Sequence, residues 1–193
     1  MRSFSKKQFW YILPFIAVVI TLVIFANRFK EEVSWQIVDE VSDQLSLALR
    51  TELGNEEEEA LRIALVLSEN DTFRRALEEE DDEQAFSALK RMIDTIQNNT
   101  SSVVRAQIIT ADATVFARSW DSDNLFAGMP LDPYRQDLEE IKTHKKPRAS
   151  IEVGRRLGIK ATVPMYHENT LIGYVEVLQS FDHSTNFFHK FGI

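Results

Sequence analysis

The chain has 193 residues, of which 44% are hydrophobic and 27% charged, a composition that supports one folded domain with an appended segment. Its 30 acidic and 22 basic residues give a formal net charge of −8, which argues against a nucleic-acid partner because phosphate contacts need clustered Lys and Arg. The sequence has no cysteine, so disulfides, thiolate metal sites and cysteine nucleophiles are excluded, while the cellular compartment stays open.

The first element of the chain is an uncharged run, FWYILPFIAVVITLVIFAN, from Phe9 to Asn27. At about 1.5 Å per helical residue it is long enough to cross a hydrocarbon core of about 30 Å. A cleaved signal peptide would have a shorter apolar region that ends in a small-x-small site, and IFANRF is a poor site of this kind. The sequence therefore predicts an uncleaved transmembrane anchor over residues 9–27.

The basic residues that flank this run predict its orientation. Three precede it and two follow it, namely Arg2, Lys6, Lys7, Arg28 and Lys30. Because cytoplasmic flanks carry the excess of Lys and Arg, residues 1–8 are predicted to be cytoplasmic and the rest of the chain periplasmic or extracellular. The expected location is the inner (cytoplasmic) membrane, crossed once.

Residues 28–100 are predicted to form a helical stalk and a helical layer. Apolar residues recur every four positions in the first part, as on one face of a helix; they are Val33, Ile37, Val41, Leu45, Leu49 and Leu53. At Gly54 and Asn55 the helix either breaks or continues at a cost of about 1 kcal/mol. Residues 56–59, all glutamate, are interpreted as a solvated helix face rather than a cation site.

A second helical stretch covers residues 71–99, with Asp71 as a cap and EEEDDE as a polar joint. Residues 101–181 then change to a period of two. VVRAQIIT and ATVFARSW are separated by a short hairpin signal, and a loop and a short helix capped by Asp132 lead to three more β-rich runs from Ile151 onward. This order predicts an α+β fold, in which a membrane helix and a long stalk helix lead into a five-stranded antiparallel sheet. Residues 182–193 are predicted to begin a linker helix.

Four segments of the second half carry a resemblance to a known family: RSW, DSDNLFAGMPLDPYR, KKPRASIEVGRRLGIKATVPMY and LIGYVEVLQSF. In this order they resemble the motifs of extracytoplasmic double-Cache sensor domains of bacterial chemoreceptors, histidine kinases and diguanylate cyclases. The resemblance covers about Val104 to Phe181 and implies a PAS-like sheet. It also implies a second sheet domain and a return membrane helix after Phe181, so the chain is interpreted either as a fragment or as a protein that lost its output half.

A ligand pocket is expected around the second strand of the predicted sheet. Strict alternation would place Arg118 and Trp120 on one face with Thr114 and Phe116. Arg118 can bind a carboxylate or phosphate in a bidentate manner, and Trp120 offers an aromatic wall. The structural alternatives are a salt bridge for Arg118 and plain core packing for Trp120.

Three further residues complete the predicted ligand-binding set. Tyr134 could close over the pocket from the connecting helix. Glu152 and Lys160 either contact the ligand or simply pair with each other across two strands. Amino-acid-binding Cache domains have tyrosines where this chain has Ala113 and Asp121, so the resemblance does not imply an amino-acid ligand.

The sequence offers little support for catalysis, a metal or a cofactor. Its four histidines are not spaced as ligands on one helical face, and it has no glycine-rich phosphate loop and no nucleophile elbow. The predicted function is therefore non-enzymatic: a membrane-anchored extracytoplasmic sensor that binds a small, potentially anionic molecule and relays the signal through its N-terminal helix as a parallel homodimer. The alternative is an anchored interaction or dimerisation module without a small ligand, and an anchored hydrolase is the weakest reading.

Overall fold

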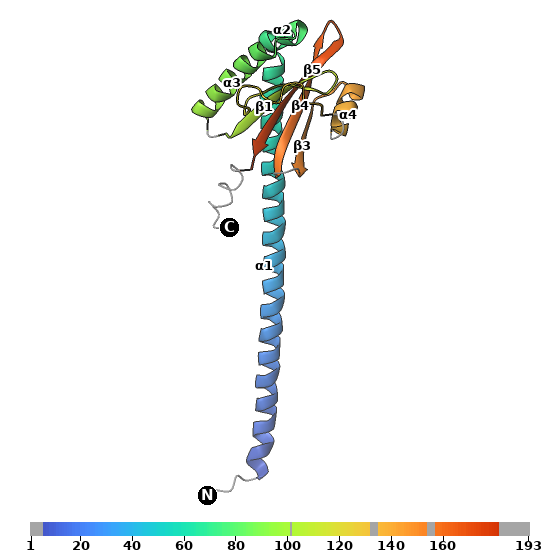
Figure 1. The fold of residues 1–193 in the computed structure, drawn as a ribbon. Helices are drawn as coiled ribbons and strands as arrows, with labels where there is room; N and C mark the ends of the chain where they lie inside the picture. Colours follow the sequence, from blue (N-terminus) through green and yellow to red (C-terminus); the bar gives the residue numbers. More distant parts are fainter. Residues whose placement is uncertain (1–5, 101, 132–134, 154–156, 182–193) are drawn as a thin grey trace. The chain divides into compact units, whose positions relative to one another are not determined.

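The structure is a computed structural model that describes residues 6–100, 102–131, 135–153 and 157–181, with side chains from residue 17 onward except that of Val153. The chain divides into two compact units, Met1–Thr51 and Glu52–Ile193. Helix α1 (Lys6–Ser68) supplies the first unit and continues into the second (Figure 1). Among the side chains that are described, no helical stretch is both long and apolar enough to cross a membrane. The side chains of residues 9–16, in the first half of the predicted anchor, lie outside the described part.

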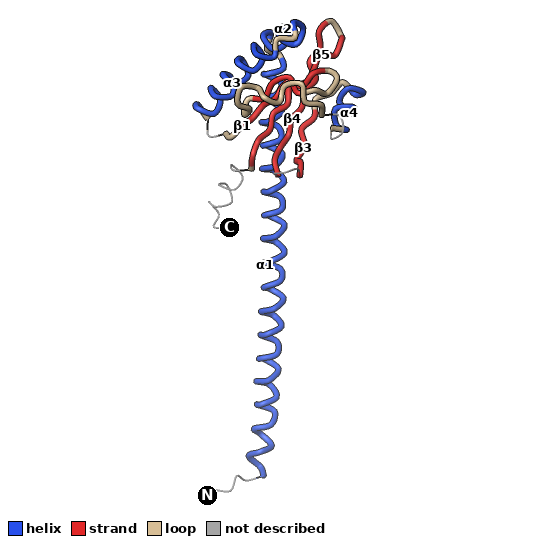
Figure 2. Tube along the Cα trace, in the orientation of Figure 1, coloured by secondary structure: helices blue, strands red, loops and turns tan. Residues whose placement is uncertain are grey.

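The second unit contains the remaining helices and a sheet. Helices α2 (Asp71–Glu79), α3 (Asp82–Asn99) and α4 (Gln136–His144) accompany strands β1 (Val104–Thr110), β2 (Val115–Arg118), β3 (Arg148–Val153), β4 (Leu157–His167) and β5 (Thr170–Ser180). The strands are antiparallel in the order β2-β1-β5-β4-β3 (Figure 2). The predicted α+β class and five-stranded antiparallel sheet are confirmed.

The main core lies between one face of the sheet and the end of α1, α2 and α3. Because side chains alternate along a strand, Ala106, Val175 and Ala161 point to this face from three neighbouring strands and are buried. Ala60 and Phe73 are among the helical residues that cover them. We call this the helical face of the sheet.

A smaller core covers part of the opposite face. Ile109 and Tyr174 project from the sheet and pack with Leu138 and Ile141 of α4 and with Leu131 of the preceding loop. We call this the α4 face. Its apolar packing is confined to this cluster, so the adjacent part of the face is left for polar side chains.

Gly173 lets β5 pass close to its neighbours. A Cβ atom at this position would stand 2.5 Å from the Ile109 carbonyl oxygen and 3.0 Å from Leu77 Cδ1. Only glycine fits this approach without moving backbone. Gly54, in contrast, lies within α1, which continues through the possible break, and nothing lies within 4 Å of an added Cβ there.

The structure corrects two expectations for the helices. Asn70, not Asp71, caps α2, because its side-chain oxygen accepts the Thr72 N–H at 2.8 Å. Glu56 is not on a solvated face but is buried at 6% exposure, where Gln179 of β5 donates a hydrogen bond to it. The polar joint is confirmed between α2 and α3, while the expected cap Asp132 and residues 182–193 lie outside the described residues.

Strict alternation along the second strand is also wrong. Ile108 pairs with Ala117 and Ile109 with Val115, so Phe116 is an extra residue in a β-bulge. Phe116 belongs to the core of the helical face, whereas Arg118 turns to the α4 face and contacts Gln107. Thr114 precedes the strand and forms an isolated bridge with Pro130.

Candidate ligand-binding site

A buried carboxylate lies at the centre of the α4 face. Glu176 of β5 is 1% exposed and stands between Gln107 of β1 and Thr162 of β4 in the strand register. Gln107 Nε2 donates to its Oε1 at 2.5 Å, and Thr162 Oγ1 donates to its Oε2 at 3.1 Å. Because a buried charge is costly unless it is paired, Glu176 also needs a cation.

Arg135, just before α4, is that cation. Its Nη2 forms an ion pair with Glu176, and its Nε and Nη2 donate to Asp137 at 2.8 and 2.9 Å. Burial alone would lower the pKa of Arg135, but hydrogen bonding to Asp137 and the charge of Glu176 raise it above its usual value. Helix α4 is thus attached to the sheet by buried charge pairs as well as by its apolar residues.

Asp137 extends the network to the third and fourth strands. Lys160 Nζ of β4 lies 2.9 Å from Asp137 Oδ2 and also pairs with Glu152 of β3. Burial would raise the pKa of Asp137, but hydrogen bonds from Arg135 and Lys160 hold it well below its usual value. The Lys160 side chain is 8% exposed and that of Glu152 is 45% exposed, so the network reaches solvent at Glu152.

Arg118 lies at the opposite end of this network from Glu152. Its Nε donates to Gln107 Oε1 at 2.8 Å, and its guanidinium carbon lies 5.5 Å from the ring centroid of Trp120 and 5.6 Å from that of Phe126. Within the described part of the chain, no carboxylate oxygen comes within 4.0 Å of its guanidinium. Burial is the main cause that lowers the pKa of Arg118, opposed by Asp121 and Glu176. Arg118 is therefore a fixed, half-buried cation whose terminal amino groups are available.

Seven side chains form one continuous chain of contacts across the α4 face; in order they are Glu152, Lys160, Asp137, Arg135, Glu176, Gln107 and Arg118. We call them the charged chain. Three cations and three carboxylates balance, so the chain is formally neutral. Its inner members satisfy one another, and a ligand can therefore exchange contacts only at its two ends.

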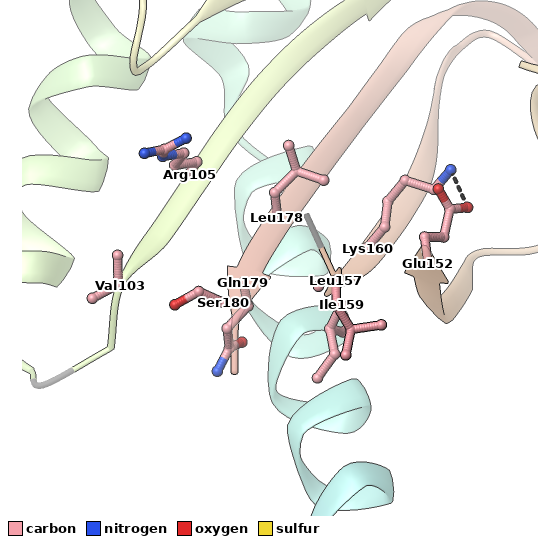
Figure 3. Close-up of a pocket in the computed structure, with 10 residues that line it drawn as sticks. Val103, Arg105, Glu152, Leu157, Ile159, Lys160, Leu178, Gln179 and Ser180 are labelled. Atoms are coloured by element: carbon pink, nitrogen blue, oxygen red, sulfur yellow. Dashed lines mark ion pairs between the residues drawn. The ribbon is translucent and has the colours of Figure 1, made fainter. Parts of the chain in front are cut away.

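A cavity of about 290 Å³ adjoins the Glu152 end. It lies where β1 begins and β5 ends, and its lining includes Val103, Arg105, Leu157, Leu178, Glu152 and Lys160 (Figure 3). Among the described residues no cluster of three or more His, Cys, Asp or Glu side chains could hold a metal ion. The α4 face thus combines charged side chains at both ends of the charged chain with apolar side chains in this cavity.

The structure divides the predicted site residues into two groups. Arg118 and Trp120 lie together at one end of the charged chain, with Trp120 in the turn after β2 rather than on the strand. Glu152 and Lys160 form the predicted ion pair at the other end, diagonally because Lys160 is registered with Ser150. Tyr134 lies outside the described residues.

Sequence reasoning missed the middle of the chain. The predicted ligand-binding set did not include Gln107, Arg135, Asp137 or Glu176. Two signals were present: Gln107 is a polar residue inside an apolar strand, and Arg135 belongs to the YR pair of the PYRQD segment. The partners of these residues were not visible, because Glu176 is 69 residues from Gln107 and 41 from Arg135.

Comparison with known proteins identifies the class. A family model described as the double sensory domain of two-component sensor kinases (dCache_3) matches residues 39–191. The chain thus has the fold and sequence of an extracytoplasmic sensor domain of membrane receptors, a class of signal-transduction modules that are not themselves catalytic. More particularly, it belongs to this double-Cache family. No curated protein matches it.

Solved sensor domains share the fold at low sequence identity. The sensor domain of the Vibrio cholerae histidine kinase DctB is 16% identical with a TM-score of 0.54, and the match covers 72% of this chain and 53% of that one. The Escherichia coli DcuS sensor domain is 15% identical with a TM-score of 0.51, covering 69% and 94%. A domain of a sensory box/GGDEF family protein from Vibrio parahaemolyticus is 15% identical with a TM-score of 0.55, covering 77% and 62%. This chain therefore spans about half the length of the DctB sensor domain.

Proposed function

We propose that this chain is the membrane-anchored, ligand-sensing part of a bacterial receptor and that it binds a small anionic molecule at Arg118. The observation that carries the proposal is the state of this guanidinium. Gln107 fixes its Nε, two aromatic rings flank it, and no carboxylate of the described residues pairs with it. Such a preorganised cation binds a carboxylate or phosphate group with little loss of conformational freedom.

The remainder of the ligand would contact Trp120. This side chain is 37% exposed, and its position against Arg118 leaves ring surface for an apolar or planar group. Aromatic surface next to a few convergent polar groups is typical of small-molecule sites. An occupant would compete with solvent for Arg118 rather than with a protein carboxylate, so ligand binding needs no ion pair to be broken.

A relay from this site can pass through β5. Glu176 of the charged chain points to the α4 face, and Gln179, three residues later, points to the helical face and donates to Glu56 of α1. Both partners of the second contact are buried. A change in the pairing of Glu176 could therefore alter the contact between Gln179 and Glu56 of α1. Such a relay requires that the domain has two states with different affinity for the ligand.

The alternative function, an interaction module without a small ligand, is favoured by one feature. An apolar groove of about 500 Å³ lies between α1 and α3, lined by Ile63, Val66, Met92 and Ile96 with Arg62 and Arg91 at its margin. Val66 is 65% exposed, and such surface is typical of protein contacts. In this alternative a second protein covers the groove and Arg118 carries only its structural contacts.

Ligand-dependent stabilisation distinguishes the two functions. Full-length protein in detergent would be screened by thermal unfolding against small carboxylates and phosphates, with an Arg118→Gln variant as the matched control. A sensor is stabilised by at least one anion in the wild type only, because a ligand that binds the native state alone raises its stability by mass action. Equal responses of the two proteins to every anion would contradict binding at Arg118.

Membrane anchoring has a separate test. The full-length protein is expected to remain with membranes after carbonate washing, because residues 9–27 carry no charge. Release of a shortened soluble form would contradict the anchor without affecting the ligand site.

A further inference from the structure

We infer that the cavity between β1, β5 and β4 is a second ligand site, for a small aliphatic carboxylate, distinct from the Arg118 site. The cavity has a volume of about 290 Å³, which lies near the lower limit of known ligand pockets. Neither Arg118 nor Trp120 is among the described residues of its lining. The inference therefore does not rest on the function proposed above.

The cavity combines an apolar floor with charged sides. Figure 3 shows Leu178 between Arg105 on one side and the paired Lys160 and Glu152 on the other. Val103 and Leu157, which also line it, are 48% and 54% exposed. Aliphatic side chains exposed inside a concavity are the surface that an aliphatic ligand would cover.

The polar end of the ligand is specified by the partners of Lys160. This lysine holds two carboxylates, of which Asp137 is 16% exposed and also bonded to Arg135, whereas Glu152 is 45% exposed. Glu152 is the exchangeable partner because its carboxylate can return to water at little cost. A ligand carboxylate that takes its place on Lys160 Nζ keeps the buried ammonium paired and hydrogen-bonded.

The charges around the cavity also argue against a cationic ligand. When Glu152 turns away, Lys160 keeps only Asp137 as a partner, and Arg105 adds a second cation that has no carboxylate of the described residues within ion-pair distance. An amine bound to Glu152 would instead place a third cation beside these two, which is unfavourable in a partly dry site. The ligand class is therefore a small anion with an apolar body.

Hexanoate, hexan-1-ol and hexylamine are matched probes of this inference, with calorimetric titration of the full-length protein in detergent as the assay. Hexanoate is expected to bind with a Kd of about 1 mM, since small ligands gain at most about 1.5 kcal/mol per non-hydrogen atom and ordinarily much less. Hexan-1-ol and hexylamine should bind at least about tenfold more weakly, because neither supplies a charge-assisted bond to Lys160. Absence of hexanoate binding at about 20 mM, or tighter binding of hexylamine, overturns the inference.

Three variants locate the binding. Glu152→Gln should tighten hexanoate binding by about two- to fivefold, because it removes the competing partner of a partly exposed ion pair. Leu157→Trp should weaken it by at least about tenfold by filling the cavity, whereas Leu125→Trp, at a leucine that is 75% exposed and outside the lining, should not.

Weaker binding in Glu152→Gln, or equal effects of the two tryptophan substitutions, would overturn the assignment. Lys160 itself is a poor position for the test, because its removal leaves Asp137 with a buried, partly unpaired charge. The substitutions at Glu152, Leu157 and Leu125 spare the inner members of the charged chain, so thermal unfolding of each of these three variants should resemble that of the wild type.

Discussion

Arg118→Ala should mainly weaken anion binding, whereas Arg135→Ala should mainly destabilise the fold. Arg118→Ala leaves Gln107 Oε1 without its donor and removes a contact with Trp120. An unsatisfied buried acceptor costs about 1–3 kcal/mol, and an exposed cation–π contact contributes about 0.5–1 kcal/mol. Since Gln107 can be rehydrated from the space that the arginine leaves, we expect a loss of about 1–2 kcal/mol of unfolding free energy.

Arg135→Ala should be far more damaging. It strands Glu176, which is 1% exposed, and removes both hydrogen bonds to Asp137. Removing one partner of a buried ion pair costs about 3–5 kcal/mol. For a domain of this size each kcal/mol lowers Tm by about 2–5 °C, so Arg135→Ala should melt roughly 6–25 °C below the wild type and Arg118→Ala about 2–10 °C below it.

Denaturant unfolding followed by circular dichroism would measure both free energies, and anion titration would measure affinity on the same samples. Arg118→Ala should lose about ten- to a hundredfold in affinity for an anion, since a charge-assisted bond contributes about 1.5–3 kcal/mol. Arg118→Lys, which keeps the charge but not the planar arrangement of donors, should have an anion affinity between those of the wild type and Arg118→Ala. If Arg118→Ala destabilises the fold as much as Arg135→Ala while binding is retained in the folded fraction, the reasoning is refuted and Arg118 is a structural residue.

Three other expectations concern acid stability, backbone packing and association. The pKa of Asp137 is depressed in the fold, so the stabilisation that its charge gives is complete above its unfolded pKa of about 3.9 and is lost as the pH falls below that value. Asp137→Asn should therefore be less stable than the wild type at neutral pH. In urea unfolding from pH 7 downward, the unfolding free energy of the variant should fall less steeply with pH than that of the wild type. Gly173→Ala should cost several kcal/mol, because its Cβ would meet the Ile109 carbonyl oxygen at 2.5 Å, whereas Gly54→Ala should stabilise by about 0.5–1 kcal/mol; similar melting of the two variants would contradict the close approach. Val41→Glu in α1 should weaken dimerisation in analytical ultracentrifugation if the apolar stripe from Val33 to Leu53 is the contact, and an unchanged mass would exclude this stripe.

The elements of this protein were largely predictable from local pattern. A four-residue apolar repeat predicted the long helix, and a change to period two near Val103 predicted the start of the sheet. These signals are local because the residues on one face of a helix or strand recur at a fixed spacing within a single short segment. Local strings also carried the family resemblance, which the match over residues 39–191 confirms.

Local pattern failed where the chain departs from regular geometry. The bulge at Phe116 shifts the alternation of β2 by one residue, and nothing in VFAR distinguishes a bulged strand from a regular one. Glu56 looked solvated because it stands in a run of glutamates, yet its side chain is buried beside Gln179, 123 residues away. In both cases the neighbour that decides the outcome is distant in sequence.

The candidate site was the least predictable part for the same reason. Sequence alone supplied Arg118, Trp120, Glu152 and Lys160 as residues of suitable chemistry, and it could pair only the last two. Tertiary structure decided that Arg118 has no carboxylate partner among the described residues, and that Glu176 is matched with Arg135 instead. Whether a charge is free to bind a ligand depends on the distances of all other charges around it, and those distances are set by strand register and helix packing rather than by any local string.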